Sequence, residues 1–198
     1  MSLKKKFLHY VIPSVVAMWV FSIYTMVDGI FVARGVGETA LAAVNIAMPF
    51  INTIFALSLC FAVGASTLIA IAKGKGNHDE ANQIFSLNTA LLFIISIAIT
   101  VVALWQLEPL ATFLGATDST MVYVKDYLSY IIVFSMCFIV SYCLEVLVKT
   151  DGFPILATVG VCLSAVTNIV LDYFFVIVFQ WGVKGAAIAT GLSQLILL

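Results

Sequence analysis

Charged residues are scarce in this chain of 198 residues. Asp, Glu, Lys and Arg make up 10% of it, whereas hydrophobic residues make up 63%. A typical soluble domain is about a quarter charged and about half apolar, so this composition excludes an ordinary soluble domain. The formal net charge is −1, which provides no basic surface for nucleic acid. HExxH and GxSxG motifs are also absent, as are paired histidines on one helical face, so we expect no enzymatic activity.

The chain also lacks any CxxC pair. Its four cysteines, Cys60, Cys137, Cys143 and Cys162, all fall in apolar runs. Free cysteines in such surroundings behave as small hydrophobic residues. We therefore expect buried packing residues and neither a metal centre nor a redox site there.

Long apolar runs dominate the chain, whose mean hydropathy is +1.17. The runs are continuous rather than alternating, which favours membrane-spanning helices over a β-barrel, and about 20 apolar residues cross a bilayer. The connections are short, so residues 1–198 are expected to form a single transmembrane bundle. The fold class is an all-α polytopic membrane protein with six spans. They lie at about 8–34, 40–72, 83–107, 121–148, 154–179 and 185–198. The last run is too short to finish a crossing, which predicts a truncated chain or further structure beyond Leu198.

Basic residues are unevenly distributed between the two sides that these spans define. Six lie on the side of the N-terminus: Lys4, Lys5, Lys6, Lys73, Lys75 and Lys149. Three lie on the other side: Arg34, Lys125 and Lys184. Positive charge favours the cytoplasmic side, so we expect a cytoplasmic N-terminus in the cell (inner) membrane. Trp105 and Trp181 then fall at outer helix ends, where indole rings are common.

Three carboxylates interrupt the apolar runs: Asp28, Glu145 and Asp172. A charge at membrane depth is costly, and such residues usually face a bundle interior or a wet cavity. Glu145 lies one turn before Lys149, so we interpret it as half of an interfacial ion pair. Asp28 and Asp172 have no such partner in sequence, and we interpret both as functional.

Polar residues at helical spacing accompany these carboxylates. Asn168 and Asp172 share one helix face, Ser164 extends that face, and Thr190 and Gln194 repeat the spacing on the last span. If these faces meet Asp28, they form an oxygen-lined chamber suited to a proton or to Na⁺. The cation- or proton-binding residues are then Asp28, Asn168, Asp172 and Thr190, the same set that would hold Na⁺. Further cavity-lining candidates are Asn45, Asn52, Tyr127, Ser164 and Gln194.

Structural explanations compete with this interpretation. Asn168 alone is typical of a hydrogen bond between membrane helices, and the hydroxyl of Thr190 would ordinarily bond to its own helix. Asn45 and Asn52 flank Pro49, where a helix kink would account for them.

Two pairs of sequence motifs resemble the multidrug and toxic compound extrusion (MATE) transporters. They are VDGIFVARGVG at 27–37 with ALAAVNIAMP at 40–49, and NIVLD at 168–172 with GVKGAAIAT at 182–190. The resemblance covers essentially the whole chain as that family's first six helices, and the DinF-like bacterial branch is the most similar. Ala33 stands where the family often has Gly, and Lys149 precedes a Thr-Asp-Gly triplet where Arg is common.

The resemblance implies two six-helix bundles around a central cavity, working by alternating access. It implies efflux of organic, often cationic, drug-like compounds in exchange for H⁺ or Na⁺, with no cofactor besides the coupling ion. The family's N-terminal ion site maps onto Asp28, Asn168, Asp172 and Thr190. This chain would supply one bundle, and a C-terminal bundle or a second copy would be needed to close the cavity within membrane lipid.

Two other functions are compatible with such a bundle. A flippase for lipids or lipid-linked precursors would favour a basic cavity, but no Lys or Arg lies well inside the apolar runs. A structural subunit that transports nothing would tolerate the loss of either aspartate. The sequence selects neither a substrate nor H⁺ over Na⁺, because the same oxygen ligands suit both ions.

Overall fold

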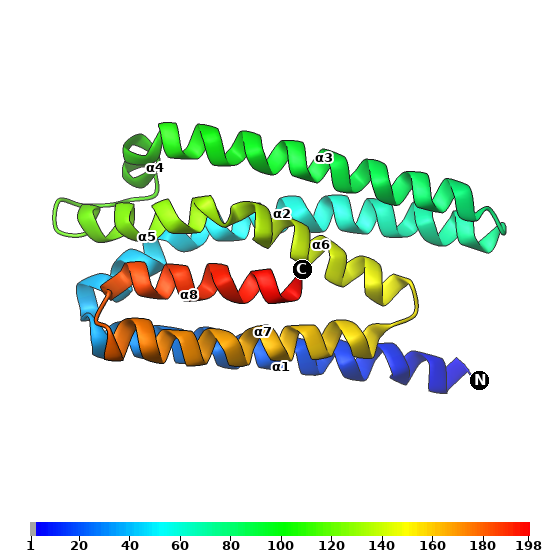
Figure 1. The fold of residues 1–198 in the computed structure, drawn as a ribbon, viewed down its shortest axis with the longest axis horizontal. Coiled ribbons are helices and arrows are strands. Elements are labelled where there is room, and N and C mark those ends of the chain that lie inside the picture. The colour runs from blue at the N-terminus through cyan, green and yellow to red at the C-terminus, as the bar shows by residue number, and fades with distance from the viewer. Residues whose placement is uncertain (1–2) are drawn as a thin grey trace.

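The computed structural model describes residues 3–198, except for the side chain of Lys6, one of the residues used above for orientation. Over this range the chain forms helices joined by short turns, and it contains no strand. In order they are α1 (Leu3–Gly35), α2 (Glu38–Gly74), α3 (His78–Trp105), α4 (Leu107–Phe113), α5 (Met121–Val133), α6 (Ser135–Thr150), α7 (Pro154–Asp172), the π-helix η1 (Tyr173–Val178) and α8 (Gly182–Leu197). The long helices run along one axis as a bundle (Figure 1).

Long apolar helices confirm the predicted class of all-α membrane bundle. Four of them are long and apolar enough to cross a bilayer: α1, α2, α3 and the continuous stretch Pro154–Val178. A fifth crossing results if α5 and α6, which meet at a bend of 53°, are counted together. The sixth predicted run forms α8, an apolar helix of 16 residues. Many large apolar side chains, such as Trp19, Ile94 and Val166, are exposed on the outside of the bundle, where lipid would cover them.

Two details differ from the sequence prediction. The stretch 106–120, expected to be a connection, contains the short helix α4, whose first turn carries Glu108 near the positive helix end. The predicted fourth span, 121–148, is broken at Phe134. There the hydroxyl of Thr100 on α3 lies 3.3 Å from the carbonyl oxygen of Ile132 and 2.9 Å from the hydroxyl of Ser135. A hydroxyl from a neighbouring helix thus contacts both sides of the break.

The connections divide between the two ends of the bundle. The N-terminus lies at one end with the α2–α3 and α6–α7 connections, the α1–α2, α3–α4, α4–α5 and η1–α8 connections lie at the opposite end, and α5 meets α6 between the two ends (Figure 1). Lys73 pairs with Asp151 at the N-terminal end, whereas the pairs Lys125–Glu108 (2.7 Å) and Lys184–Asp126 (3.3 Å) lie opposite. Both Trp105 and Trp181 are exposed at that opposite end.

Small residues allow the helices to approach closely. The most extensive contacts join α1 with α7, α2 with α6, and α7 with α8. Buried alanines, among them Ala43, Ala47 and Ala62, line the contacts of α2, as is usual where membrane helices pack without bulky side chains. Cys137 and Cys143 are buried, as predicted for all four cysteines, but that prediction is wrong for Cys60, which is exposed, and Cys162 is half-buried. The reason is helical phase, since Cys60 lies on the outward face of α2.

Candidate functional site

Two carboxylates from different helices meet inside the bundle. Asp28 on α1 is 6% exposed, and Asp172 at the end of α7 is fully buried. The two carboxyl groups are close enough to interact electrostatically with each other. The structure therefore brings together two carboxyl groups that lie far apart in sequence.

The packing of α1 against the α7–η1 segment produces this meeting. The helices contact each other extensively, and Gly35 of α1 packs tightly against Val176 and Ile177 of η1. A Cβ atom on Gly35 would lie 2.7 Å from Cγ1 of Val176, so only glycine fits there without displacement. Asp172 is the last α-helical residue before η1. Such π-helical turns often occur at functional sites, because they change the direction of the side chains beside them.

Asn168 lies one turn before Asp172 and is 1% exposed. Its Nδ2 donates to Oγ1 of Thr190 on α8 at 3.4 Å, and Thr190 in turn donates to the carbonyl oxygen of Ala186 at 2.8 Å. The predicted residues Asp28, Asn168, Asp172 and Thr190 therefore converge from α1, α7 and α8. The hydroxyl of Thr190 bonds to its own helix, as the structural explanation anticipated, but it also contacts Asn168.

Apart from the opposing carboxyl group, four buried oxygen atoms in this cluster have no hydrogen-bond partner in the protein. They are Oδ1 of Asp28, Oδ1 of Asn168, and both carboxyl oxygens of Asp172. An unpaired buried polar group costs about 1–3 kcal/mol, and more when it is charged. Oxygens of carboxyl, amide and hydroxyl groups fit either a proton shared between the aspartates or a hard cation. Within residues 3–198, no group of three or more His, Cys, Asp or Glu side chains could hold a metal ion.

Two tyrosines complete the surroundings of the carboxyl pair. Tyr127 on α5, a predicted cavity-lining residue, is 2% exposed and interacts electrostatically with both aspartates. Tyr24 does so from α1, and the sequence interpretation missed it. Its position one turn before Asp28 was the available signal, because residues four apart share a helix face.

The remaining cavity-lining candidates make other contacts. Ser164 donates to the carbonyl oxygen of Ser193 at 2.7 Å, and Gln194 accepts from the hydroxyl of Ser141 at 2.9 Å. Both are buried and hold α8 against its neighbours. Asn45 is exposed, and Asn52, also exposed, lines a different pocket.

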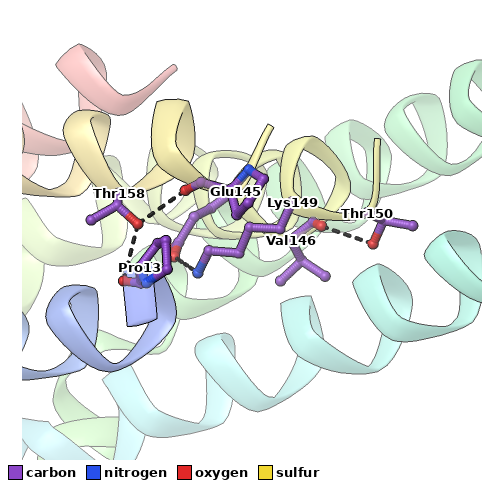
Figure 2. A network of polar contacts seen from close by, with 7 residues as sticks. Pro13, Glu145, Val146, Lys149, Thr150 and Thr158 are labelled. Atoms are coloured by element: carbon purple, nitrogen blue, oxygen red, sulfur yellow. Dashed lines mark hydrogen bonds and ion pairs between the residues drawn. The ribbon is translucent and has the colours of Figure 1, made fainter. Parts of the chain in front are cut away.

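The pocket that Asn52 lines has a volume of about 490 Å³ and is bounded by α1, α2, α6 and α7. It contains the predicted ion pair, in which Nζ of Lys149 lies 2.5 Å from Oε1 of Glu145. Figure 2 shows this pair beside Thr158, whose hydroxyl lies 3.0 Å from the carbonyl oxygens of both Pro13 and Pro154. The ion pair is confirmed, but it lies on the wall of a pocket and is only slightly exposed.

Comparisons with known proteins place this geometry in context. The MatE family model matches residues 13–174. Multidrug export protein MepA of Staphylococcus saprophyticus is 23% identical over 195 residues, covering 98% of this chain and 43% of that protein. MepA of Staphylococcus aureus strain MRSA252 is 24% identical over 190 residues, covering 96% of this chain and 42% of that protein. These relatives are named as exporters, which agrees with the absence of enzyme motifs in this sequence.

Solved structures of MATE transporters are also similar to this chain. An outward-facing multidrug resistance MATE transporter of the MOP superfamily matches with a TM-score of 0.91 and 28% identity. A MOP superfamily transporter from Pyrococcus furiosus, described as having a binding pocket of reversed polarity, also matches with a TM-score of 0.91 and 28% identity. Each match covers 98% of this chain and 43% of the other. The chain therefore spans less than half the length of the proteins it matches.

Proposed function

Because this chain belongs to the MatE family, whose model matches residues 13–174, we propose that it is one bundle of an exporter that exchanges small organic compounds for H⁺ or Na⁺. The fold supports this proposal, since the chain is a multi-pass membrane bundle similar to MATE transporter structures. The coupling ion would bind where Asp28, Asn168, Asp172 and Thr190 converge.

The buried carboxyl pair carries the proposal. Asp28 and Asp172 come from different helices, and Oδ1 of Asp28 and both carboxyl oxygens of Asp172 are buried without a backbone or side-chain donor. Two adjacent buried carboxylates repel each other, so the pair favours uptake of a proton or a cation. Loading removes that repulsion and allows α1 to pack more closely on α7, whereas unloading restores it. Two states of the bundle that differ in this packing would couple ion binding to movement.

The rest of the transporter would come from a second six-helix bundle or from a second copy of this chain. The relatives are more than twice as long as the segment matched here, which supports the first arrangement. The substrates would be drug-like organic compounds, often cationic. The protein would lie in the cell (inner) membrane, with its N-terminus in the cytoplasm as the distribution of Lys and Arg predicts.

Reconstituted transport tests the ion site. We expect Asp28→Asn and Asp172→Asn each to abolish ethidium movement driven by a proton or Na⁺ gradient in proteoliposomes that contain the full-length protein. Asp118→Asn is the matched control, because Asp118 is exposed in a connection, and we expect it to transport normally. Imposing the two gradients separately identifies the coupling ion. Normal transport by both site variants at normal protein levels would refute the assignment.

A further inference from the structure

The ion pair between Glu145 and Lys149 is the least exposed of the four pairs found in residues 3–198. Its side chains are 11% and 22% exposed, whereas every side chain in the other three pairs is at least 36% exposed. An exposed pair at this spacing is an ordinary helix-stabilising contact. Removing two charges from water is costly, so a largely buried pair requires another explanation.

Aromatic rings from three helices line the pocket that contains this pair. Phe55 on α2 packs edge-on against Phe21 on α1, with ring centroids 6.4 Å apart, and against Tyr142 on α6 at 5.3 Å. All three rings line the pocket, together with the adaptable side chain of Met18. Aromatic faces attract organic cations, most strongly where water is excluded. The volume of about 490 Å³ is within the range of small-molecule sites.

Charge gives the pocket its polarity. Glu145 is the one carboxylate among the described residues that line it, and Lys149 is the one cation. Resting on the export function proposed above, we propose that Glu145 binds the cationic group of an aromatic substrate and that Lys149 is a tethered counter-ion which the substrate displaces. The pocket is distinct from the aspartate pair, because Phe21 precedes Asp28 by about 10 Å along α1.

Displacement of the Lys149 ammonium from Glu145 is favourable when the ligand is an aromatic cation. Lys149 lies in the last turn of α6, and its flexible stem can carry the ammonium group outward to water, where it is strongly hydrated. A small inorganic cation would gain nothing from the aromatic wall. An aromatic cation is weakly hydrated and contacts Phe21, Phe55 and Tyr142 while it replaces the ammonium at Glu145. The tethered lysine thereby selects aromatic organic cations over small hydrated ones.

Binding of tetraphenylphosphonium to the full-length protein in lipid nanodiscs tests the proposal. We expect Glu145→Gln to weaken binding roughly tenfold or more, the effect of losing a contact to a charged group. We expect Lys149→Met to strengthen binding, because the competing ammonium is gone. Binding of the neutral triphenylphosphine oxide should change little in either variant. The exposed pair supplies matched controls, and Glu108→Gln and Lys125→Met should leave tetraphenylphosphonium binding unchanged.

A second measurement needs no variant at Glu145 or Lys149. Tetraphenylphosphonium should increase the acetylation of Lys149 by acetic anhydride in the unmodified protein, while the labelling of Lys125 stays constant. Unchanged affinity in Glu145→Gln, weaker binding in Lys149→Met, or unchanged or reduced labelling of Lys149 would each overturn the proposal. Failure of the proposed ion site would appear differently, as normal gradient-driven transport by Asp28→Asn and Asp172→Asn.

Discussion

The ring of Phe134 lies directly against the backbone of Gly191. A Cβ atom at Gly191 would be 2.1 Å from Cδ2 of that ring, a separation that real structures do not show. Phe134 is the residue at which α5 and α6 meet at 53°, and Gly191 lies in the middle of α8. The bend in the broken span therefore packs against a glycine of another helix.

Alanine at position 191 should disturb the packing of Phe134 against α8. The added methyl group forces the Phe134 ring aside, and overpacking of this kind costs about 1–3 kcal/mol. We expect Gly191→Ala to lower the thermal unfolding temperature of the protein in detergent. Adding Phe134→Leu, which shortens the ring side chain, should restore part of the loss.

A matched glycine controls for helix propensity. Gly64 lies within α2, and a Cβ atom there would meet nothing within 4 Å. Because alanine is the better helix former, Gly64→Ala should leave the unfolding temperature unchanged or raise it slightly. Equal melting of the Gly191 and Gly64 variants would show that the contact with Phe134 does not constrain the bend.

The exposed pair at the opposite end makes a prediction about pH. The ammonium of Lys125 donates to the Glu108 carboxylate and holds the pKa of Glu108 below its ordinary value. The pair is therefore formed at neutral pH and is lost as the pH falls through that lowered pKa. An NMR titration of the Glu108 carboxyl should report the lowered pKa in the unmodified protein, and Lys125→Gln should return it toward the ordinary glutamate value. An identical titration in both proteins would contradict the contact.

Membrane orientation is testable with single cysteines. Lys75 follows α2 at the N-terminal end of the bundle, and Asp118 lies in the connection at the other end, and both are exposed. With the N-terminus in the cytoplasm, an impermeant maleimide should label Asp118→Cys on intact cells and Lys75→Cys only after permeabilisation. The unsubstituted protein, with its four native cysteines, gives the background labelling. The reverse pattern would invert the proposed topology.

Much of the site could be predicted from helical spacing alone. Asn168 and Asp172 share a face of an α-helix, and a carboxylate within an apolar run usually turns inward, which also predicted the burial of Asp28. The sequence could not reveal which faces meet, because that depends on packing between helices. Asn52 illustrates this limit, since it lines the pocket of Glu145 rather than the aspartate cluster.

The broken span and the π-helix escaped prediction for a related reason. Proline and glycine are the usual local signals of a helix break, but neither occurs in residues 121–150 around Phe134 or in the run Tyr173–Val178. The break depends on Thr100 and Gly191, which belong to other helices, and η1 packs against Gly35 and Gly185. Such features are specified by neighbours that are distant in sequence, so local patterns cannot indicate them.

Replacing Asp172 with asparagine should separate stability from transport. Asp172 is fully buried with both carboxyl oxygens unpaired, and its nearest charged neighbour is the like-charged Asp28. Asparagine has nearly the same shape but cannot ionise, so the substitution removes the repulsion that arises whenever both aspartates are charged, in a place where water cannot screen it. We expect the Asp172→Asn protein to melt at the same or a higher temperature than the unmodified protein at pH 8, while gradient-driven efflux is lost. A variant with lower stability and unchanged efflux would instead identify Asp172 as a structural residue.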